Sequence, residues 1–174
     1  MTTGPDRILV QNRVDFVTGA VRRYVPDVNG LTDVAERVQS LFAGPYTNDS
    51  LSVPAEGEWS ALRTLGHMIA YAEMLHGQLD RMAHMTDPEL WRMDDAGIAE
   101  REDWESRSSQ ELVQLFVDAI GNVEGLLKQL PDSSWGRAGL HPFLGRRSIL
   151  QQVRGAVSHL GGHVDQLATA MGVA

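Results

Sequence analysis

Two histidines, His159 and His163, lie four residues apart in a stretch whose pattern predicts a helix. On a helix this spacing places both imidazoles on one face, with their Cβ atoms about 6 Å apart. Since metal–nitrogen bonds are about 2.1 Å long, both rings can reach one cation. A third histidine, His67, lies far upstream in another strongly helical segment. Two ligands from one helix and one from another would make a half-open metal site on a helical scaffold.

The histidine pair also has a structural interpretation. In a chain with six histidines such a pair arises by chance, and both rings would then be solvated or bonded to neighbours such as Gln166. We interpret the other three histidines as structural. His76 lies in an aliphatic stripe, His84 lies near a helix end, and His141 lies before a proline in a loop. No glutamate stands inside the pair as in the zinc-protease pattern His-Glu-x-x-His, so metalloprotease chemistry is not expected.

Helical periodicity dominates the chain, whereas strand patterns are weak. We expect Pro26 to end a first helix and Thr32 to cap a second, and Ser60, Ser108 and Ser148 to begin the others. The predicted helices cover residues 6–24, 31–42, 60–85, 108–130 and 148–171. Residues 88–107 are expected to form a long connection with short helical turns, and a loop is expected before Ser148. The predicted fold is all-α, a four-helix bundle at 31–174 with a helical N-terminal extension at 1–30.

At 100° per residue, the three histidines lie at the margins of their helices. His159 and His163 share one edge of an apolar stripe, and His67 lies off the main aliphatic stripe of its own helix. A pocket can open at such margins, whereas the centre of a core face is filled. Gly161 and Gly162 resemble no phosphate loop, and we interpret them as close helix packing or as room for a ligand.

The bulk composition excludes several classes of function. The 174 residues suit one domain, and the formal net charge of −8, with 15 Lys+Arg against 23 Asp+Glu, argues against nucleic-acid binding. The chain has no cysteine, which excludes disulfides, iron–sulfur clusters, thiolate zinc sites and a cysteine nucleophile. Any thiol chemistry would need a thiol that arrives on a small molecule. We find neither a signal-peptide pattern nor a membrane span, and expect a cytoplasmic protein.

Taken together, three motifs resemble those of a known family. Trp59-Ser60 opens the helix that carries His67, and a His-Pro-x-x-Gly motif at 141–145 leads into Ser148. The last helix carries His159-x-x-x-His163, followed by Asp165-Gln166-Leu167. This pattern resembles the DinB-like (YfiT-like) superfamily of metal-dependent four-helix-bundle proteins, over residues 31–171.

The resemblance implies one divalent metal, zinc or nickel, held by His67, His159 and His163. Family members with an assigned activity are similar to thiol-S-transferases that use bacillithiol or mycothiol, and related mycothiol-dependent isomerases share the scaffold. Beside a cation with an open position, a thiol loses its proton and becomes a nucleophile, and water does the same in a hydrolase. The sequence does not separate these outcomes.

We therefore predict a metal-dependent transferase that joins a low-molecular-weight thiol to a small electrophile. The alternatives are a hydrolase, a metal-containing binding protein without turnover, and a helical interaction module that retains no metal. The sequence assigns neither catalytic nor thiol-binding residues. It is compatible with a homodimer, although no residue specifies one, and three histidines suit iron and copper as well as zinc and nickel.

Overall fold

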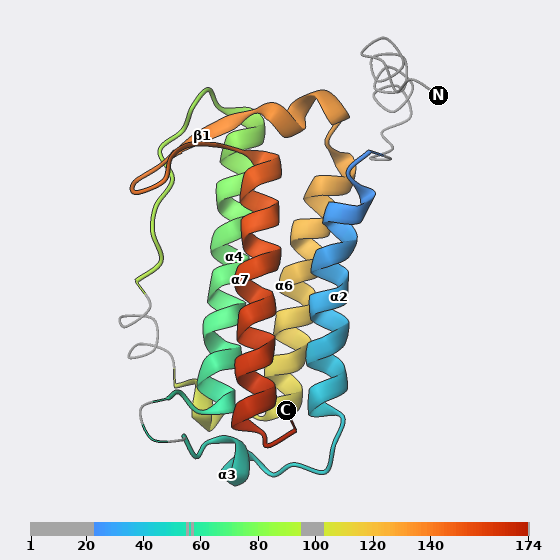
Figure 1. Cartoon of the computed structure of the whole chain (residues 1–174), viewed down its shortest axis with the longest axis vertical. Helices are drawn as coiled ribbons and strands as arrows, with labels where there is room; N and C mark the ends of the chain where they lie inside the picture. Colours follow the sequence, from blue (N-terminus) through green and yellow to red (C-terminus); the bar gives the residue numbers. More distant parts are fainter. Residues whose placement is uncertain (1–22, 55, 57, 95–102, 174) are drawn as a thin grey trace.

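The computed structural model describes residues 23–54, 56, 58–94 and 103–173. Within these ranges four long helices form a bundle (Figure 1), which confirms the predicted all-α architecture. The helices are α2 (Val25–Phe42), α4 (Ala61–His84), α6 (Ser109–Gln129) and α7 (Ile149–Ala170). In this described part, no helix is both long enough and apolar enough to cross a membrane.

The four helices are arranged in the cyclic order α2, α6, α4, α7, so that α2 lies diagonally opposite α4. Figure 1 shows α2 and α7 running in one direction and α4 and α6 in the other. The seam between α4 and α7 is thus antiparallel, whereas α4 and α6 are parallel neighbours. A parallel pair needs a connection that returns along the length of the bundle, which explains the long segment between α4 and α6.

Polar side chains fix the starts of three helices where the sequence predicts them. The hydroxyls of Ser60 and Ser108 accept hydrogen bonds from the backbone N–H groups of Arg63 and Glu111. At Ser148 the full capping box forms, because the side chain of Gln151 also accepts from the Ser148 N–H. Each cap satisfies a backbone donor that has no partner within the helix.

The predicted start of the second helix at Leu31 is wrong. Helix α2 begins at Val25 and holds Pro26 in its first turn, where a missing N–H costs no hydrogen bond. Thr32 is not a cap, because its hydroxyl donates to Glu124 of α6 at 2.6 Å. Most of the helix predicted at 6–24 lies outside the described residues. The division into 1–30 and 31–174 stays a prediction.

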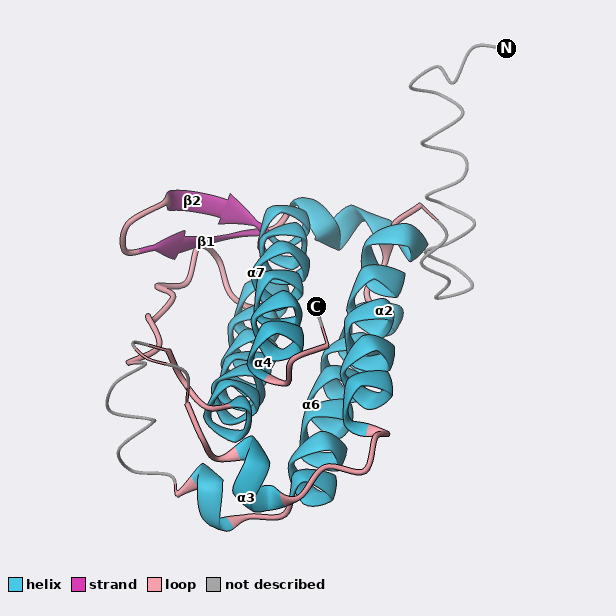
Figure 2. Cartoon of the chain, turned by 60° about the horizontal axis from the view of Figure 1, so that its bottom comes forward, coloured by secondary structure: helices cyan, strands magenta, loops and turns pink. Residues whose placement is uncertain are grey.

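A β-hairpin stands where the sequence predicts only a loop. Strands β1 (Ala138–His141) and β2 (Gly145–Ser148) pair antiparallel, with His141 opposite Gly145. Gly145 has φ +68°, a conformation that glycine adopts without strain. Figure 2 shows the hairpin projecting from the end of the bundle beside α7. A single parallel bridge joins Leu140 to Glu89, so the hairpin also holds the chain that follows α4.

Shorter elements complete the described chain: α3 (Asn48–Leu51) and the 3-10 helices η1 (Trp104–Ser106) and η2 (Asp132–Gly136). The core lies between the four long helices and is mainly aliphatic, with Phe116 and Trp135 as its largest fully buried side chains. In η1 the indole of Trp104 packs directly on Gly66 of α4, where any Cβ would overlap it. This contact fixes the stretch of α4 next to His67.

Candidate metal centre

The structure brings His67 of α4 together with His159 and His163 of α7. The Nε2 atom of His159 lies 3.5 Å from Nε2 of His67 and 3.2 Å from Nε2 of His163. One ligand nitrogen from each ring lies within 4.8 Å of the others. His67 is 6% exposed, His163 is half-buried and His159 is exposed. The cluster thus runs from the bundle interior to its surface across the α4–α7 seam.

The spacing of these nitrogens fits a single cation. Two nitrogens held tetrahedrally about 2.1 Å from one metal lie about 3.4 Å apart, close to the two Nε2 separations given above. Three neutral imidazoles also match the ligand set of zinc sites that keep one position open. The donor type and these two separations therefore fit a single cation.

A chain of hydrogen bonds orients His163. Its Nδ1 lies 2.9 Å from Oε1 of Gln166, an oxygen that can only accept, so Nδ1 carries the proton. Nε2 is then left with a lone pair, and it lies 3.2 Å from Nε2 of His159. The amide of Gln166 in turn donates to Glu58 Oε2 at 3.2 Å. Such partners hold a ligand histidine in one tautomer and one ring orientation.

An aromatic ring lies beside each of the other two histidines. The Trp59 ring lies 5.1 Å from the His67 ring, and the Tyr71 ring lies 4.4 Å from the His159 ring, measured between centroids. Burial raises the pKa of the Tyr71 hydroxyl, and the positive charge of Arg147 partly offsets this rise. At neutral pH the hydroxyl therefore keeps its proton and can donate it in a hydrogen bond.

A cavity of about 160 Å³ opens beside the exposed ring of His159. Its walls come from α4, from α7, from the chain after α4 and from the hairpin. The lining residues are Tyr71, Met74, Gln78, Trp91, Arg92, Met93, His141, Gln152 and His159. A second cavity, about 270 Å³, touches Trp59, Glu58 and Gln166 on the other side of the triad. The three histidines thus lie between two hollows on the α4–α7 face.

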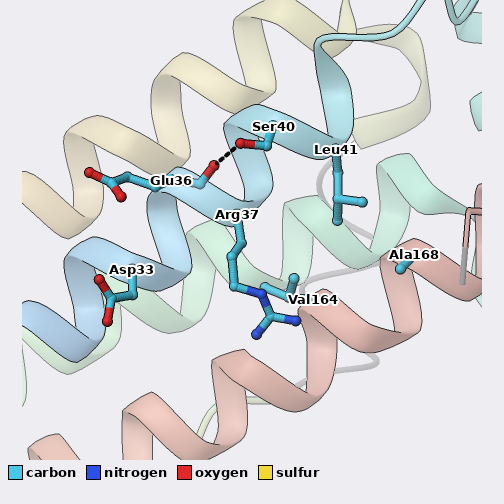
Figure 3. Close-up of a pocket in the computed structure, with 7 residues that line it drawn as sticks. All are labelled: Asp33, Glu36, Arg37, Ser40, Leu41, Val164 and Ala168. Atoms are coloured by element: carbon cyan, nitrogen blue, oxygen red, sulfur yellow. Dashed lines mark hydrogen bonds between the residues drawn. The ribbon is translucent and has the colours of Figure 1, made fainter.

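A larger groove lies elsewhere. It has a volume of about 550 Å³ and is lined by residues of α2 and α7 (Figure 3). Arg37 extends from α2 towards α7 and forms an ion pair with Asp165 at 2.7 Å, while Ser40 bonds back to the Glu36 carbonyl. None of the three histidines lines this groove. Its size alone does not make it the reaction site.

The sequence predicts structural roles for the three remaining histidines, His76, His84 and His141, and the contacts of His84 and His141 agree with this. His84 Nδ1 lies 2.9 Å from the Asp80 carbonyl near the end of α4. His141 Nδ1 accepts from the backbone N–H groups of Phe143 and Leu144, both at 3.2 Å, and so closes the hairpin turn. His141 also lines the cavity, which the sequence did not predict.

The two glycines between His159 and His163 do not mediate close packing. A Cβ built on Gly161 or Gly162 would meet no heavy atom within 4 Å. Of the two interpretations of this pair, room for a ligand is the one that this open space allows. Glu58 and Arg147 are site residues that sequence reasoning missed, because their proximity to the triad depends on how loops fold back onto the bundle.

The comparisons with known proteins agree with this geometry. The sequence matches the DinB superfamily over residues 31–167, well over half of the chain. The chain belongs to the DinB superfamily. No curated protein matches it significantly.

Among solved structures, this DinB-superfamily chain is similar to YfiT from Bacillus subtilis, with a TM-score of 0.77 and 17% sequence identity. The match covers 89% of this chain and 91% of YfiT. YfiT is described as a probable metal-dependent hydrolase with an unusual four-helix bundle topology. At this identity the likeness shows a shared fold.

Proposed function

We propose that the protein is a metal-dependent transferase that joins a low-molecular-weight thiol, of the mycothiol or bacillithiol class, to a small electrophile. The observation that carries the proposal is the convergence of His67, His159 and His163 beside an open cavity. The absence of cysteine is consistent with it, because the nucleophilic sulfur would then come from the co-substrate.

In this proposal the three histidines hold one divalent cation, zinc or nickel. When bound, such a cation supplies a positive charge that lowers the pKa of a thiol or water beside it. Gln166 keeps His163 in the ligating tautomer, and Trp59 limits the access of water to the buried side of His67. The protonated Tyr71 hydroxyl lines the cavity, where it can donate a hydrogen bond to an oxygen of the substrate.

A second candidate is a metal-dependent hydrolase, which the description of YfiT favours. The same histidines would serve both reactions, and only the nucleophile differs. A thiol-consumption assay with electrophiles separates the two. A transferase consumes thiol in step with the electrophile, whereas a hydrolase consumes its substrate without thiol.

The experiment that tests the site is the metal content of tag-free protein, measured by elemental mass spectrometry. We expect about one equivalent in the wild type and in His76→Ala, whose histidine lies elsewhere on α4. We expect a loss of the metal in His163→Ala. Absence of metal from the wild type after reconstitution with zinc or nickel would contradict both enzymatic functions.

A further inference from the structure

The cavity beside His159 differs in charge from the chain as a whole. The chain carries 23 Asp+Glu against 15 Lys+Arg, yet none of the described residues that line this cavity is acidic. Arg92 lines it directly, and its guanidinium carbon lies 5.5 Å from the centre of the Phe143 ring. A second cation, Arg147, lies behind the cavity wall.

Arg147 is held in place by a network of buried amides. Its Nε donates to Gln152 Oε1 at 3.0 Å, and Nη2 donates to the Gln151 carbonyl at 2.7 Å. The Gln152 amide then donates to Gln78 Oε1 at 2.7 Å, and the Gln78 amide to the Trp91 carbonyl at 2.7 Å. Gln78 and Gln152 are 1% and 8% exposed. Such a network fixes its members in one geometry because an unpaired buried amide is costly.

The charge of Arg147 is not cancelled by these partners, because both oxygens that it contacts are neutral. Its field also reaches two other residues of the cavity wall. It lowers the pKa of His141, adding to the larger effect of burial, and it opposes the rise in the pKa of Tyr71. Gly155 contributes by leaving space, since a Cβ there would lie 3.0 Å from Nη2 of Arg147.

We propose that this cavity binds a small molecule that carries a carboxylate, with Arg92 in the wall contacting the carboxylate, Arg147 behind the wall adding its positive charge, and the reacting end directed at His159. The inference rests on the proposed function, because it takes the triad as the reaction centre. A guanidinium matches the planar geometry of a carboxylate and can bind both oxygens. The volume of about 160 Å³ equals that of about five water molecules, so the bound acid is small.

The carboxylate can belong to the thiol or to the electrophile, and two pairs of probes distinguish these sources. The first pair is 3-mercaptopropionate and its amide, and the second is crotonate and crotonamide. Each is titrated into full-length protein, both zinc-loaded and metal-free, while the Trp91 indole N–H is followed by NMR. Four proteins are compared: the wild type, Arg92→Gln, Arg147→Gln and Arg146→Gln. Arg146 is the matched control, because it lies next along the strand and pairs with Asp87 at 3.0 Å.

We expect the wild type to bind the acid of at least one pair about tenfold more tightly than its amide, as a charge-assisted hydrogen bond provides. Arg92→Gln should reduce this preference to less than about twofold, Arg147→Gln should lower it by a smaller factor, and Arg146→Gln should keep it. The pair that shows the preference identifies the carrier of the carboxylate. Arg92 is exposed, so Arg92→Gln is expected to fold, and it decides the test even if Arg147→Gln does not fold.

Two results would overturn the inference. One is equal binding of acid and amide in both pairs by the wild type. The other is a preference that persists in Arg92→Gln, because a carboxylate held by the metal or by another group would produce it. The metal-free titrations keep this test separate from the proposed function, since they remain informative even if the triad binds no metal.

Discussion

Replacing Gln166 with leucine isolates the effect of the hydrogen bond that orients His163. The side chains have similar volume, so the helix and the ring positions should change little. The substitution removes the oxygen 2.9 Å from His163 Nδ1 and the link to Glu58 beyond it. The His163 ring can then turn or carry its proton on Nε2, and either change takes a ligand nitrogen away from the cation.

The expected loss is tenfold to a hundredfold in metal affinity. A hydrogen bond between neutral groups contributes about 0.5–1.5 kcal/mol net, and one to a charged group about 1.5–3 kcal/mol. Binding a cation polarises the imidazole ring, so the energy of its hydrogen bond approaches that of a bond to a charged group. A difference of about 1.4 kcal/mol corresponds to a factor of ten in affinity. The same range is typical when a hydrogen-bond partner of a ligand histidine is removed. Glu58→Gln should have a smaller effect, because its bond is longer and its side chain is exposed.

The assay is a competition titration of zinc against a chelating dye, at constant pH and salt. Gln39→Leu, the same substitution on the exposed face of α2, serves as the control and should bind zinc like the wild type. If Gln166→Leu binds zinc within about twofold of the wild type, then Gln166 does not set the tautomer of His163. The reasoning about this chain of hydrogen bonds would then be refuted.

Zinc at about 100 times its dissociation constant should stabilise the wild type by about 2.7 kcal/mol, a rise of about 5–10 °C in Tm. It should leave the Tm of His163→Ala unchanged. Equal shifts in the Tm of the two proteins would contradict the metal site. Gly66→Ala should lower the free energy of unfolding by about 1–3 kcal/mol, because the added Cβ overlaps the indole of Trp104. Gly121→Ala, whose Cβ would meet nothing within 4 Å, should raise the free energy of unfolding slightly. Denaturant titrations that rank the two variants the other way would exclude the contact between Gly66 and Trp104. The pKa of His141 should lie below the usual histidine value of about 6.5, first because the ring is partly buried and second because Arg147 is positively charged. The contribution of His141 to stability is therefore full above about pH 6.5 and is lost as the pH falls through the lowered pKa. An NMR titration that gives a pKa at or above about 6.5 would contradict this.

The sequence predicts the bundle well because the signals for its helices are local. Apolar periodicity identifies the helical segments, and Ser60, Ser108 and Ser148 mark three of the starts within a residue. Pro26 misleads, because proline ends a helix when it lies in the interior but is well tolerated in the first turn. Whether a helix continues after Pro26 depends on whether the residues that follow it pack against the bundle, and Gly30 packs against Val157 of α7.

The site could be predicted only in part. The i,i+4 spacing of His159 and His163 follows from helix geometry, and His67 was a candidate from its place at the margin of another predicted helix, a choice that the family resemblance supports. Whether α4 presents its histidine to α7 depends on the order of helices around the bundle, which no local pattern contains. The hairpin was missed because four-residue strands gain their stability from pairing. Their sequence, with Gly139 and two arginines, carries little alternation.

The way in which the hairpin and the chain after α4 are attached to the bundle allows the cavity wall to change in evolution without a change in the position of the histidines. The two segments meet each other through backbone hydrogen bonds, from Leu90 to the Leu140 carbonyl and from Leu140 to the Pro88 carbonyl, both below 3 Å. The triad, in contrast, rests on the rigid seam of α4 and α7. Residues at the hairpin tip and in 91–93 can therefore change without moving the histidines. One scaffold can in this way keep a constant reactive centre while its descendants diverge in the molecules that they accept.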